Sequence, residues 1–526
     1  MQTRRAVLTR GLILGALGVG PLGMGAPGCG RKTAKVGALE FDPDGFTELN
    51  TTIDTAAGPR TIAYRFHKAI PYVAEPVAVA YQSLNVSVPV SIDGAAVDPS
   101  VRPIVFANSV GGYMPSSVAN ANGVGGGGMT GAPPGGGGPP GPAGAPGRGP
   151  PAEVASGGNA MMNHGRMVNI AQQALAAGFV VVEPGARGRT LVNAEGVYYG
   201  VAPAAIVDLK AAVRYVRANR GRIPGNTDRI VSTGVSAGGA LSFLLGASGD
   251  SALYGPLLAE LGAADASDGI FAAGSWCPIT DLGHADRAYE WNWGLNPLST
   301  GALVDQVVSR QLAAEFGPYQ ASLGLHGVDD FGAVTADNYG EYLVRTHLQP
   351  SARRYLEGLS PADRSAYLLA NPFLNWRDGQ ASFSWNDFLR HVGPRRKTAP
   401  AFDAFDLAAP ENNLFGRGRR QARHFTDYSL RRATGDPNAR IDADLPGVLD
   451  LMNPMYFLAA ANPGRSRRWW LRVGTKDSDT SLTIVSNLAL AAEKLGDDVN
   501  TAYYWDAGHG ANEDVGDFLN WVGRLS

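Results

Sequence analysis

The stretch of sequence that decides the fold is RIVSTGVSAGGALSFLL, which occupies residues 229–245. Its first half is rich in β-branched and small residues, a composition typical of a buried strand in a parallel sheet. Its second half contains alanine, leucine and glycine, with apolar residues at helical spacing. The pentapeptide between the halves, GVSAG at residues 234–238, matches the pattern G-x-S-x-G. The stretch therefore predicts a strand, a sharp turn at Ser236 and a helix.

Ser236 is the predicted nucleophile. A serine on such a turn is held in a strained backbone conformation, and glycines two positions to either side let the neighbouring backbone pass without a side-chain clash. Its hydroxyl then stands clear of the sheet edge, and the N-terminus of the helix points at it. A chain with 69 glycines produces some such pentapeptides by chance. The prediction therefore depends on the flanking strand and helix, and a glycine-rich structural turn is the alternative.

Length and composition indicate a globular protein with an ample core. The 526 residues allow two or three domains, and 44% of them are hydrophobic while 17% are charged. A net charge of −2 gives no electrostatic reason to expect binding to nucleic acid or to an anionic membrane surface. The two cysteines, Cys29 and Cys277, form neither a disulfide framework nor a metal-type spacing.

Residues 1–30 resemble an export signal. The paired Arg4 and Arg5 precede an apolar, glycine-rich run at residues 11–25, which is the order found in twin-arginine leaders. This run is too short and too rich in glycine to favour a permanent transmembrane helix. Cys29 lies in a poor lipobox, because an aliphatic residue usually stands three positions before the cysteine. We expect an exported protein, periplasmic or secreted, with a lipid anchor at Cys29 as the alternative to simple cleavage.

The rest of the chain divides into two sheet-forming parts around an insertion. Residues 31–283 and 446–526 alternate strands with helices, which favours an α/β fold with a mostly parallel sheet covered on both faces. Residues 284–445 are richer in aromatic and charged residues and show no sheet strands, so we expect them to form an inserted lid domain. Residues 122–151 are nearly all glycine, proline and alanine. They are predicted to be a mobile loop that buries no core.

Two later strands end in residues that could serve the nucleophile. Acyl transfer by serine needs a base for the hydroxyl proton and a carboxylate that holds this base in one tautomer. In α/β-hydrolases the acid and then the histidine follow the last two strands. Asp477 follows the predicted strand at residues 469–474, and His509 follows the one at residues 501–505. We predict these two as the partners of the serine; Asp479 is the weaker acid candidate, because it also suits a helix N-cap.

A Gly-Gly pair follows an earlier predicted strand, at the point where this fold places an oxyanion donor. The strand covers residues 103–108, and Gly111 and Gly112 come after it. We expect the oxyanion to accept hydrogen bonds from the backbone N–H of Ala237 and from that of Gly111 or Gly112. A plain glycine turn is the alternative interpretation.

These motifs resemble those of the subtype B bacterial tannases, which are α/β-hydrolases with a large lid that cleave galloyl esters. The resemblance covers most of the chain beyond Pro103. It rests on GGYM (111–114), GVSAGG (234–239), CPITDL (277–282), HAD (284–286), YEW (289–291), KTAPAFD (397–403), EN (411–412), LFG (414–416), GTKDSDTS (474–481) and the loop around His509. The family implies the triad Ser236, Asp477 and His509, in agreement with the prediction from the residues themselves.

The resemblance also implies which residues bind the acyl group. Lys397, Glu411 and Asp479 would hydrogen-bond the three phenolic hydroxyls of a gallate ring. A substrate without these hydroxyls would leave charged groups desolvated and unpaired, so it would be rejected strongly. Considered without the family, Lys397 lies in a basic run typical of solvated surface, Glu411 fits the start of a helix, and Asp479 fits an N-cap.

Together these patterns predict an exported, monomeric serine esterase that acts on small aromatic esters, galloyl or related polyhydroxybenzoate esters, without a metal or organic cofactor. Two alternatives stay open. One is a feruloyl, chlorogenate or general carboxylesterase of the same fold, and the other is a non-catalytic binding protein on a hydrolase scaffold. Convergence of Lys397, Glu411 and Asp479 on one wall of the pocket would favour the galloyl hypothesis, and their scatter would favour the general esterase.

Overall fold

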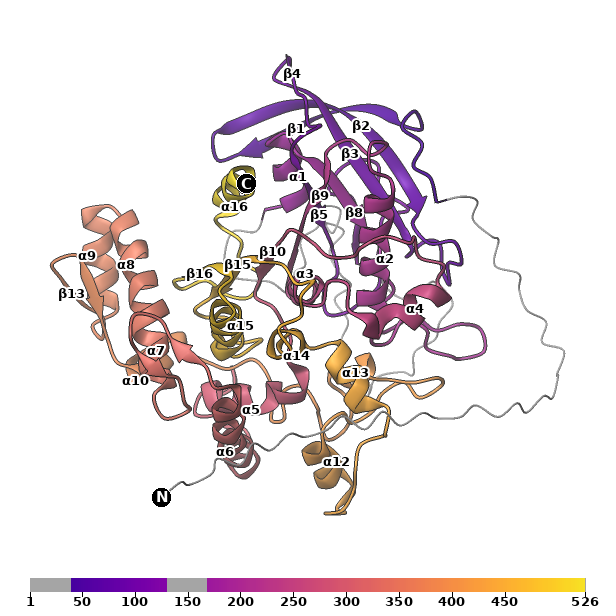
Figure 1. Ribbon diagram of the computed structural model, residues 1–526. Coiled ribbons are helices and arrows are strands. Elements are labelled where there is room, and N and C mark those ends of the chain that lie inside the picture. Colours follow the sequence, from indigo (N-terminus) through magenta and orange to yellow (C-terminus); the bar gives the residue numbers. More distant parts are fainter. Residues whose placement is uncertain (1–38, 130–167, 526) are drawn as a thin grey trace, which may run out of the picture. The chain divides into compact units, whose positions relative to one another are not determined.

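The computed structural model describes residues 39–129 and 168–525 (Figure 1). The predicted export signal at residues 1–30 and most of the predicted loop at residues 122–151 lie outside the described residues. Among the helices of the described part, none is long and apolar enough to cross a membrane.

A ten-stranded sheet runs through the described chain in the order β1-β2-β3-β8-β5-β9-β10-β15-β16, with β4 paired to β3. Its first strands form antiparallel pairs up to β3–β8, and all pairs from β8 to β16 are parallel. The strands are β1 (Thr47–Thr55), β2 (Gly58–Pro71), β3 (Ser83–Ile92), β4 (Ala95–Ala96), β5 (Pro103–Ala107), β8 (Val180–Pro184), β9 (Asn226–Val235), β10 (Ala272–Trp276), β15 (Arg468–Gly474) and β16 (Asp498–Tyr504). The predicted α/β fold with a mostly parallel sheet is confirmed.

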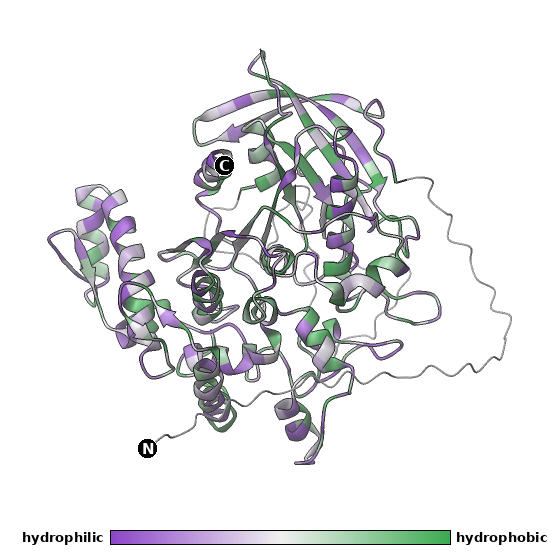
Figure 2. Cartoon of the chain, in the orientation of Figure 1, coloured by the Kyte–Doolittle hydropathy of each residue, from purple (hydrophilic) through white to green (hydrophobic). Residues whose placement is uncertain are grey.

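Helices cover both faces of this sheet, as two neighbouring tryptophans of β15 demonstrate. Trp469 stacks on Phe243 of α3 (Ala237–Ala247) at 4.2 Å between ring centroids. Trp470 meets Phe518 of α16 (Val515–Arg524) at 5.8 Å. Because successive side chains of a strand point to opposite faces, α3 and α16 lie on opposite sides of the sheet. Every residue of α3 is buried, and Figure 2 shows this helix as mostly hydrophobic, the pattern of a helix enclosed on all sides.

The remaining core helices extend these two layers. On the side of α16, α1 packs against both the sheet and α16, while on the side of α3 the helices α2, α14 and α15 form a continuous row with it. Their bounds are α1 (Ile170–Ala176), α2 (Ala204–Ala218), α4 (Gly255–Glu260), α14 (Pro454–Ala459) and α15 (Leu482–Lys494).

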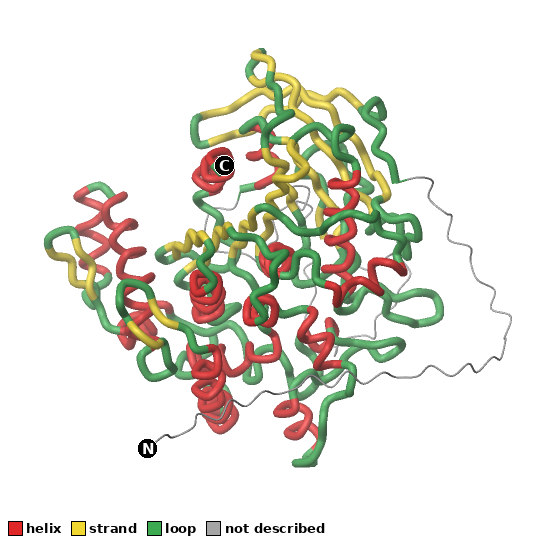
Figure 3. The backbone as a smooth tube through the Cα atoms, viewed as in Figure 1, coloured by secondary structure: helices red, strands yellow, loops and turns green. Residues whose placement is uncertain are grey.

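Between β10 and β15 the chain adds no strand to the main sheet and is mostly helix and loop (Figure 3). Two small hairpins, β11–β12 and β13–β14, are the strands that the sequence did not predict here. The elements are α5 (Leu282–Trp293), α6 (Gln306–Leu323), β11 (His326–Gly327), β12 (Gly332–Ala333), α7 (Tyr339–Leu343), α8 (Gln349–Gly358), α9 (Pro361–Ala370), β13 (Asn375–Arg377), β14 (Gln380–Ser382), α10 (Trp385–Val392), α11 (Pro410–Leu414), α12 (Asp427–Thr434) and α13 (Leu445–Leu451). That this insertion acts as a lid stays a prediction.

The first residues of the predicted mobile loop are ordered, which corrects that prediction for residues 122–129. Val124 is buried in the hydrophobic core, and the N–H of Gly125 donates to both carboxylate oxygens of Glu183 at 3.0 and 3.1 Å. Gly128 and Met129 form the short strand β7 with β6 (Ser116–Ser117). The carbonyl of Gly125 also accepts from the side-chain amide of Asn169 at 3.2 Å, so the backbone of this glycine-rich segment is hydrogen-bonded on both sides.

The buried ion pair between Glu290 and Arg395 joins α5 to the segment that precedes Lys397, and both side chains are fully buried. Arg395→Met is expected to lower the free energy of unfolding by about 3–5 kcal/mol, because Glu290 would remain charged and buried without its partner. Urea denaturation measures this loss. Arg390→Met is the matched control, since Arg390 is 77% exposed in its pair with Asp387 and should change stability little. Equal losses in the two variants would contradict the expectation.

Candidate active site

Ser236 occupies the predicted turn between β9 and α3, and the predicted strand–turn–helix is confirmed. Its backbone is strained, with φ 59° and ψ −124°. The conformation is held by the hydrogen bond that its N–H donates to the carbonyl oxygen of Trp276 at 2.9 Å. A Cβ atom on Gly234 would lie 2.5 Å from the carbonyl carbon of Gly238, so only glycine fits there. The strained turn thus presents the hydroxyl of Ser236 at the carboxyl edge of the sheet.

The structure brings the three predicted triad residues together from three different strand ends. Nε2 of His509 lies 2.9 Å from Oγ of Ser236, and Nδ1 of His509 lies 2.9 Å from Oδ2 of Asp477. The second oxygen of Asp477 accepts a hydrogen bond from the N–H of Asp479 at 3.0 Å. Asp477 is completely buried and Ser236 is 7% exposed. This chain of contacts is the arrangement that a base and its orienting carboxylate need.

The charge of Asp477 sets the proton affinity of His509. Burial favours the neutral imidazole, but the negative charge of Asp477, the neighbouring Cys277 and hydrogen bonding outweigh burial and raise the pKa of His509 well above its ordinary value. An imidazolium formed at His509 is therefore stabilised by Asp477. That stabilisation is what a base needs when it takes the proton of the nucleophile.

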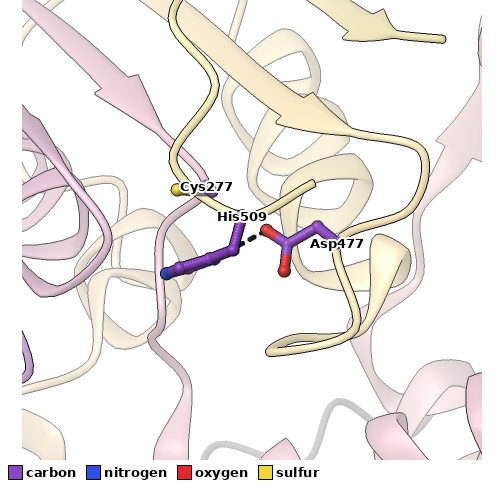
Figure 4. A group of neighbouring side chains, drawn as sticks. All are labelled: Cys277, Asp477 and His509. Atoms are coloured by element: carbon purple, nitrogen blue, oxygen red, sulfur yellow. Dashed lines mark hydrogen bonds and ion pairs between the residues drawn. The ribbon is translucent and has the colours of Figure 1, made fainter. Parts of the chain in front are cut away.

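Cys277 follows β10 and completes a group with two triad residues (Figure 4). Ligand atoms of Cys277, Asp477 and His509 all lie within 4.8 Å of one another, close enough for one soft metal ion. The hydrogen bond between Asp477 and His509 already uses two of these three groups. Within residues 39–129 and 168–525 no other group of three such side chains occurs. The same hydrogen bond accounts for the proximity of Asp477 and His509.

The predicted oxyanion segments also lie against each other. The amide of Asn108, just after β5, donates to the carbonyl of Gly238 at 3.1 Å and to Oγ of Ser242 at 2.8 Å. It therefore ties the segment that leads to Gly111 and Gly112 to the first turn of α3, where Ala237 lies. Whether Gly111 or Gly112 supplies the second donor stays open.

The backbone of Lys397 and that of Ser478, the residue before Asp479, meet at the hydroxyl of Tyr289. This hydroxyl donates to the carbonyl of Ser478 at 2.7 Å and accepts from the N–H of Lys397 at 3.2 Å. The ammonium of Lys397 lies 3.7 Å from the ring centroid of Phe402, and the residue is partly buried. Asp479 pairs with the half-exposed Arg396 at 3.0 Å. The N-cap of α15 is Ser481, which accepts from the N–H of Thr483, so the N-cap alternative for Asp479 is wrong.

Glu411 lies in the first turn of α11, as the helix-start alternative predicts, and it is only 7% exposed. Its Oε2 atom is buried and has no hydrogen-bond partner among the described residues. Burial, and in addition the charge of Glu411, raise the pKa of Tyr113, which places Glu411 beside the oxyanion loop. Convergence of the three acyl-binding candidates on one wall of the pocket stays a prediction. Lys397 and Asp479 lie beside the loop of Asp477, and Glu411 lies beside the loop of Gly112.

A cavity of about 900 Å³ lies elsewhere, between the first turn of α5 and the helices α12 and α13. None of the predicted site residues lines it. Its histidine, His284, is held by Asp281 at 2.9 Å and stacks on Tyr319. These contacts give His284 of the HAD motif a packing role, and they assign no catalytic role to it.

Sequence reasoning missed Arg189 and Tyr289, which both contact the site. Tyr289 stands in the YEW motif, but no pattern indicated that its hydroxyl joins Ser478 to Lys397. Arg189 follows β8 in a run of glycine and arginine that resembles any polar loop. Long-range contacts of this kind leave no local signal.

Comparisons with known proteins agree with this geometry. The family described as BD-FAE matches residues 156–311. The comparison with curated proteins gave no match. Among solved structures, the tannin acyl hydrolase from Lactobacillus plantarum is 33% identical, with 92% of this chain and 98% of that chain covered and a TM-score of 0.73. The tannase from Fusobacterium nucleatum is 32% identical over the same shares, with a TM-score of 0.74.

A further solved structure, a tannin acyl hydrolase in complex with ethyl gallate, is 33% identical over the same shares, with a TM-score of 0.72. Identity at this level across nearly the whole of the relatives' length, together with the shared sheet, establishes the family. The chain belongs to the bacterial tannases, a family of α/β-hydrolases.

Proposed function

We propose that the protein is a serine carboxylesterase that hydrolyses galloyl and related polyhydroxybenzoate esters. The observation that carries the proposal is the contact chain from Ser236 through His509 to Asp477, in a member of a family that includes an enzyme crystallised with ethyl gallate and one with 3,4-dihydroxybenzoate. The ester class follows from these relatives, and the reaction follows from the triad.

The proposed reaction proceeds through an acyl-enzyme. Oγ of Ser236 attacks the ester carbonyl while Nε2 of His509 takes its proton, and Asp477 stabilises the imidazolium. The oxyanion accepts from the N–H of Ala237 and from that of Gly111 or Gly112. His509 then returns the proton to the leaving alcohol. Water, activated by the same imidazole, attacks the acyl-enzyme and releases the acid and Ser236.

Acyl selection is proposed for Lys397, Glu411 and Asp479. Support comes from the buried Oε2 of Glu411, which lacks a partner among the described residues. A phenolic hydroxyl would satisfy this atom, whereas an unsubstituted ring would leave it desolvated and unpaired. Asp479 is held by a partly exposed arginine, and such a pair costs little to rearrange when a hydroxyl arrives.

A feruloyl or general carboxylesterase is the second candidate, and the BD-FAE match favours it to a limited extent. That match covers residues 156–311, which include Ser236 but none of the three acyl-binding candidates. It therefore supports this candidate through the catalytic core alone, because the three acyl-binding candidates lie outside the match.

Substituting Glu411 tests the acyl selection. Glu411→Gln keeps the shape of the side chain and removes its charge. It is expected to lower kcat/KM on methyl gallate by about 10- to 100-fold, the range for a hydrogen bond to a charged group. The rate on methyl benzoate should stay within about twofold, since no hydroxyl reaches the site. Initial rates on both esters measure this, with Ser236→Ala as the blank.

Glu341→Gln is the matched control, because Glu341 is 63% exposed in its pair with Arg345. Equal rates of the unsubstituted enzyme on the two esters would reject galloyl selectivity and favour the general esterase. A parallel fall on both esters in Glu411→Gln would assign Glu411 a structural role instead.

The raised pKa of His509 determines the acidic limb of the pH–rate profile. Because only neutral His509 accepts the proton, kcat/KM is expected to rise with pH through a midpoint above the ordinary histidine value of about 6.5. Asp477→Asn removes the charge that raises this pKa, so the midpoint should move to lower pH while kcat falls by about 10⁴-fold. Asp479→Asn should leave the midpoint in place. A midpoint that Asp477→Asn does not move would contradict the role of Asp477.

We also propose that the protein is a monomer and that the paired arginines direct its export. Simple cleavage of the signal is the proposed outcome after export, and a lipid anchor at Cys29 is the alternative. Replacing both Arg4 and Arg5 with lysine is expected to retain the protein in the cytoplasm. Cell fractionation with an immunoblot measures this. If Cys29 carries a lipid, Cys29→Ala should move the exported protein from the membrane fraction to the soluble fraction, and after simple cleavage it should change nothing. Normal export of the double variant would refute the twin-arginine route.

A further inference from the structure

Arg189 lies between the oxyanion loop and the helix that carries Glu411. Its Nε donates to the carbonyl of Gly112 at 2.8 Å, and its backbone N–H donates to the carbonyl of Tyr113 at 2.9 Å. Its Nη1 donates to Oδ1 of Asn413 at 2.8 Å, two residues after Glu411 in α11. One side chain of the catalytic core is thus bonded to both parts of the site.

The oxyanion loop needs such support because its backbone is strained. Gly112 and Tyr113 both adopt left-handed conformations, with φ of 53° and 54°, and this region is unfavourable for a bulky residue such as tyrosine. Arg189 donates a hydrogen bond to the carbonyl of each of these two residues. The hydroxyl of Tyr113 adds a hydrogen bond to the carbonyl of Ile279 at 2.7 Å. The carbonyls of Gly112 and Tyr113 belong to the peptide groups that directly follow the proposed donors, so these bonds hold the backbone next to the N–H groups of Gly111 and Gly112.

The charge of Arg189 also matters for Glu411. Burial lowers the pKa of Arg189, and the negative charge of Glu411 acts in the opposite direction, so the two charges are close. No hydrogen bond within the described part of the chain joins them, and Oε2 of Glu411 has no partner there. Arg189 therefore compensates the buried charge of Glu411 and leaves this oxygen available to a ligand.

We propose that Arg189 is a positioning residue that couples the oxyanion loop to the acyl-binding Glu411. This inference rests on the proposed function. Through Arg189 the distance between the carbonyl-binding and hydroxyl-binding groups is fixed by one guanidinium. A ring hydroxyl bound at Glu411 would thereby align the ester carbonyl with its donors, and recognition of the acyl group would raise kcat as well as lower KM.

Two substitutions of Arg189 test the coupling on methyl gallate and on 4-nitrophenyl acetate, an ester without ring hydroxyls on its acyl group. Arg189→Met removes the bonds of the guanidinium and its charge, and it is expected to lower kcat about 10- to 100-fold on both esters. It should also lower the ratio of gallate to acetate activity, because Glu411 loses its compensating charge. Arg189→Lys keeps the charge without the fork, so kcat should fall on both esters while the ratio stays near that of the unsubstituted enzyme.

Arg220→Met is the matched control, because Arg220 is 64% exposed in its pair with Asp228. Titration of Ser236 with a fluorophosphonate counts active sites, so that kcat is expressed per folded enzyme. Unchanged kcat per titrated site on both esters would reduce Arg189 to a structural residue and overturn the inference. A loss confined to methyl gallate would also overturn it, since the oxyanion loop would then not depend on Arg189. A failure of the proposed function appears separately, as an unsubstituted enzyme without preference for gallate, and leaves the acetate measurement valid.

Discussion

The site depends on the close backbone approach of three strand ends. Ser236 keeps its strained conformation because Gly234 lets the turn fold against Gly238 and because Trp276 of the next strand accepts its N–H. At the end of β15, a Cβ on Gly474 would lie 2.2 Å from the carbonyl oxygen of Ala507, so glycine is required there too. That contact brings the loop of His509 against the loop of Asp477. These steric constraints fix the loops that carry Ser236, Asp477 and His509, and the distances between the triad side chains follow from the positions of the loops.

The insertion is joined to this core through α5, whose side chains hold Arg395 and the backbone of Lys397 in position. Glu290 binds Arg395, whose Nε also donates to the carbonyl of Lys397 at 2.8 Å, while the neighbouring Tyr289 bonds to the N–H of Lys397. Two successive residues of one helix therefore hold both sides of the Lys397 peptide segment. Because Tyr289 also donates to the carbonyl of Ser478, the position of the insertion and that of the loop of Asp477 are linked. An insertion held in this way keeps the backbone of Lys397 in a fixed position relative to the loop of Asp477.

Local patterns predict the catalytic core well, and they fail where long-range contacts decide. Strand, turn and helix around Ser236 follow from composition and period, and so does the order in which Asp477 and His509 follow their strands. Lys397 and Glu411 have no such signal. Lys397 belongs to a basic run in which Arg395 is buried and Arg396 is exposed, and α11, which carries Glu411, has only five residues and no readable period. Their roles came from resemblance alone, and Arg189 escaped both kinds of reasoning because its partners lie far away in the sequence.

An unpaired buried carboxylate is costly, so its presence at Glu411 calls for a physical reason. A protein selected only for stability would replace it with an apolar side chain, because a well-packed apolar group carries no such desolvation cost. With a hydroxylated ring bound, the same carboxylate gains a charged hydrogen bond, and with a bare ring it keeps its full desolvation cost. The difference between the two substrates therefore comes from the charged hydrogen bond that only the hydroxylated ring supplies. In the free enzyme the positive charge of Arg189 lowers the free-energy cost of burying the Glu411 carboxylate, and Arg189 donates no hydrogen bond to it within the described residues.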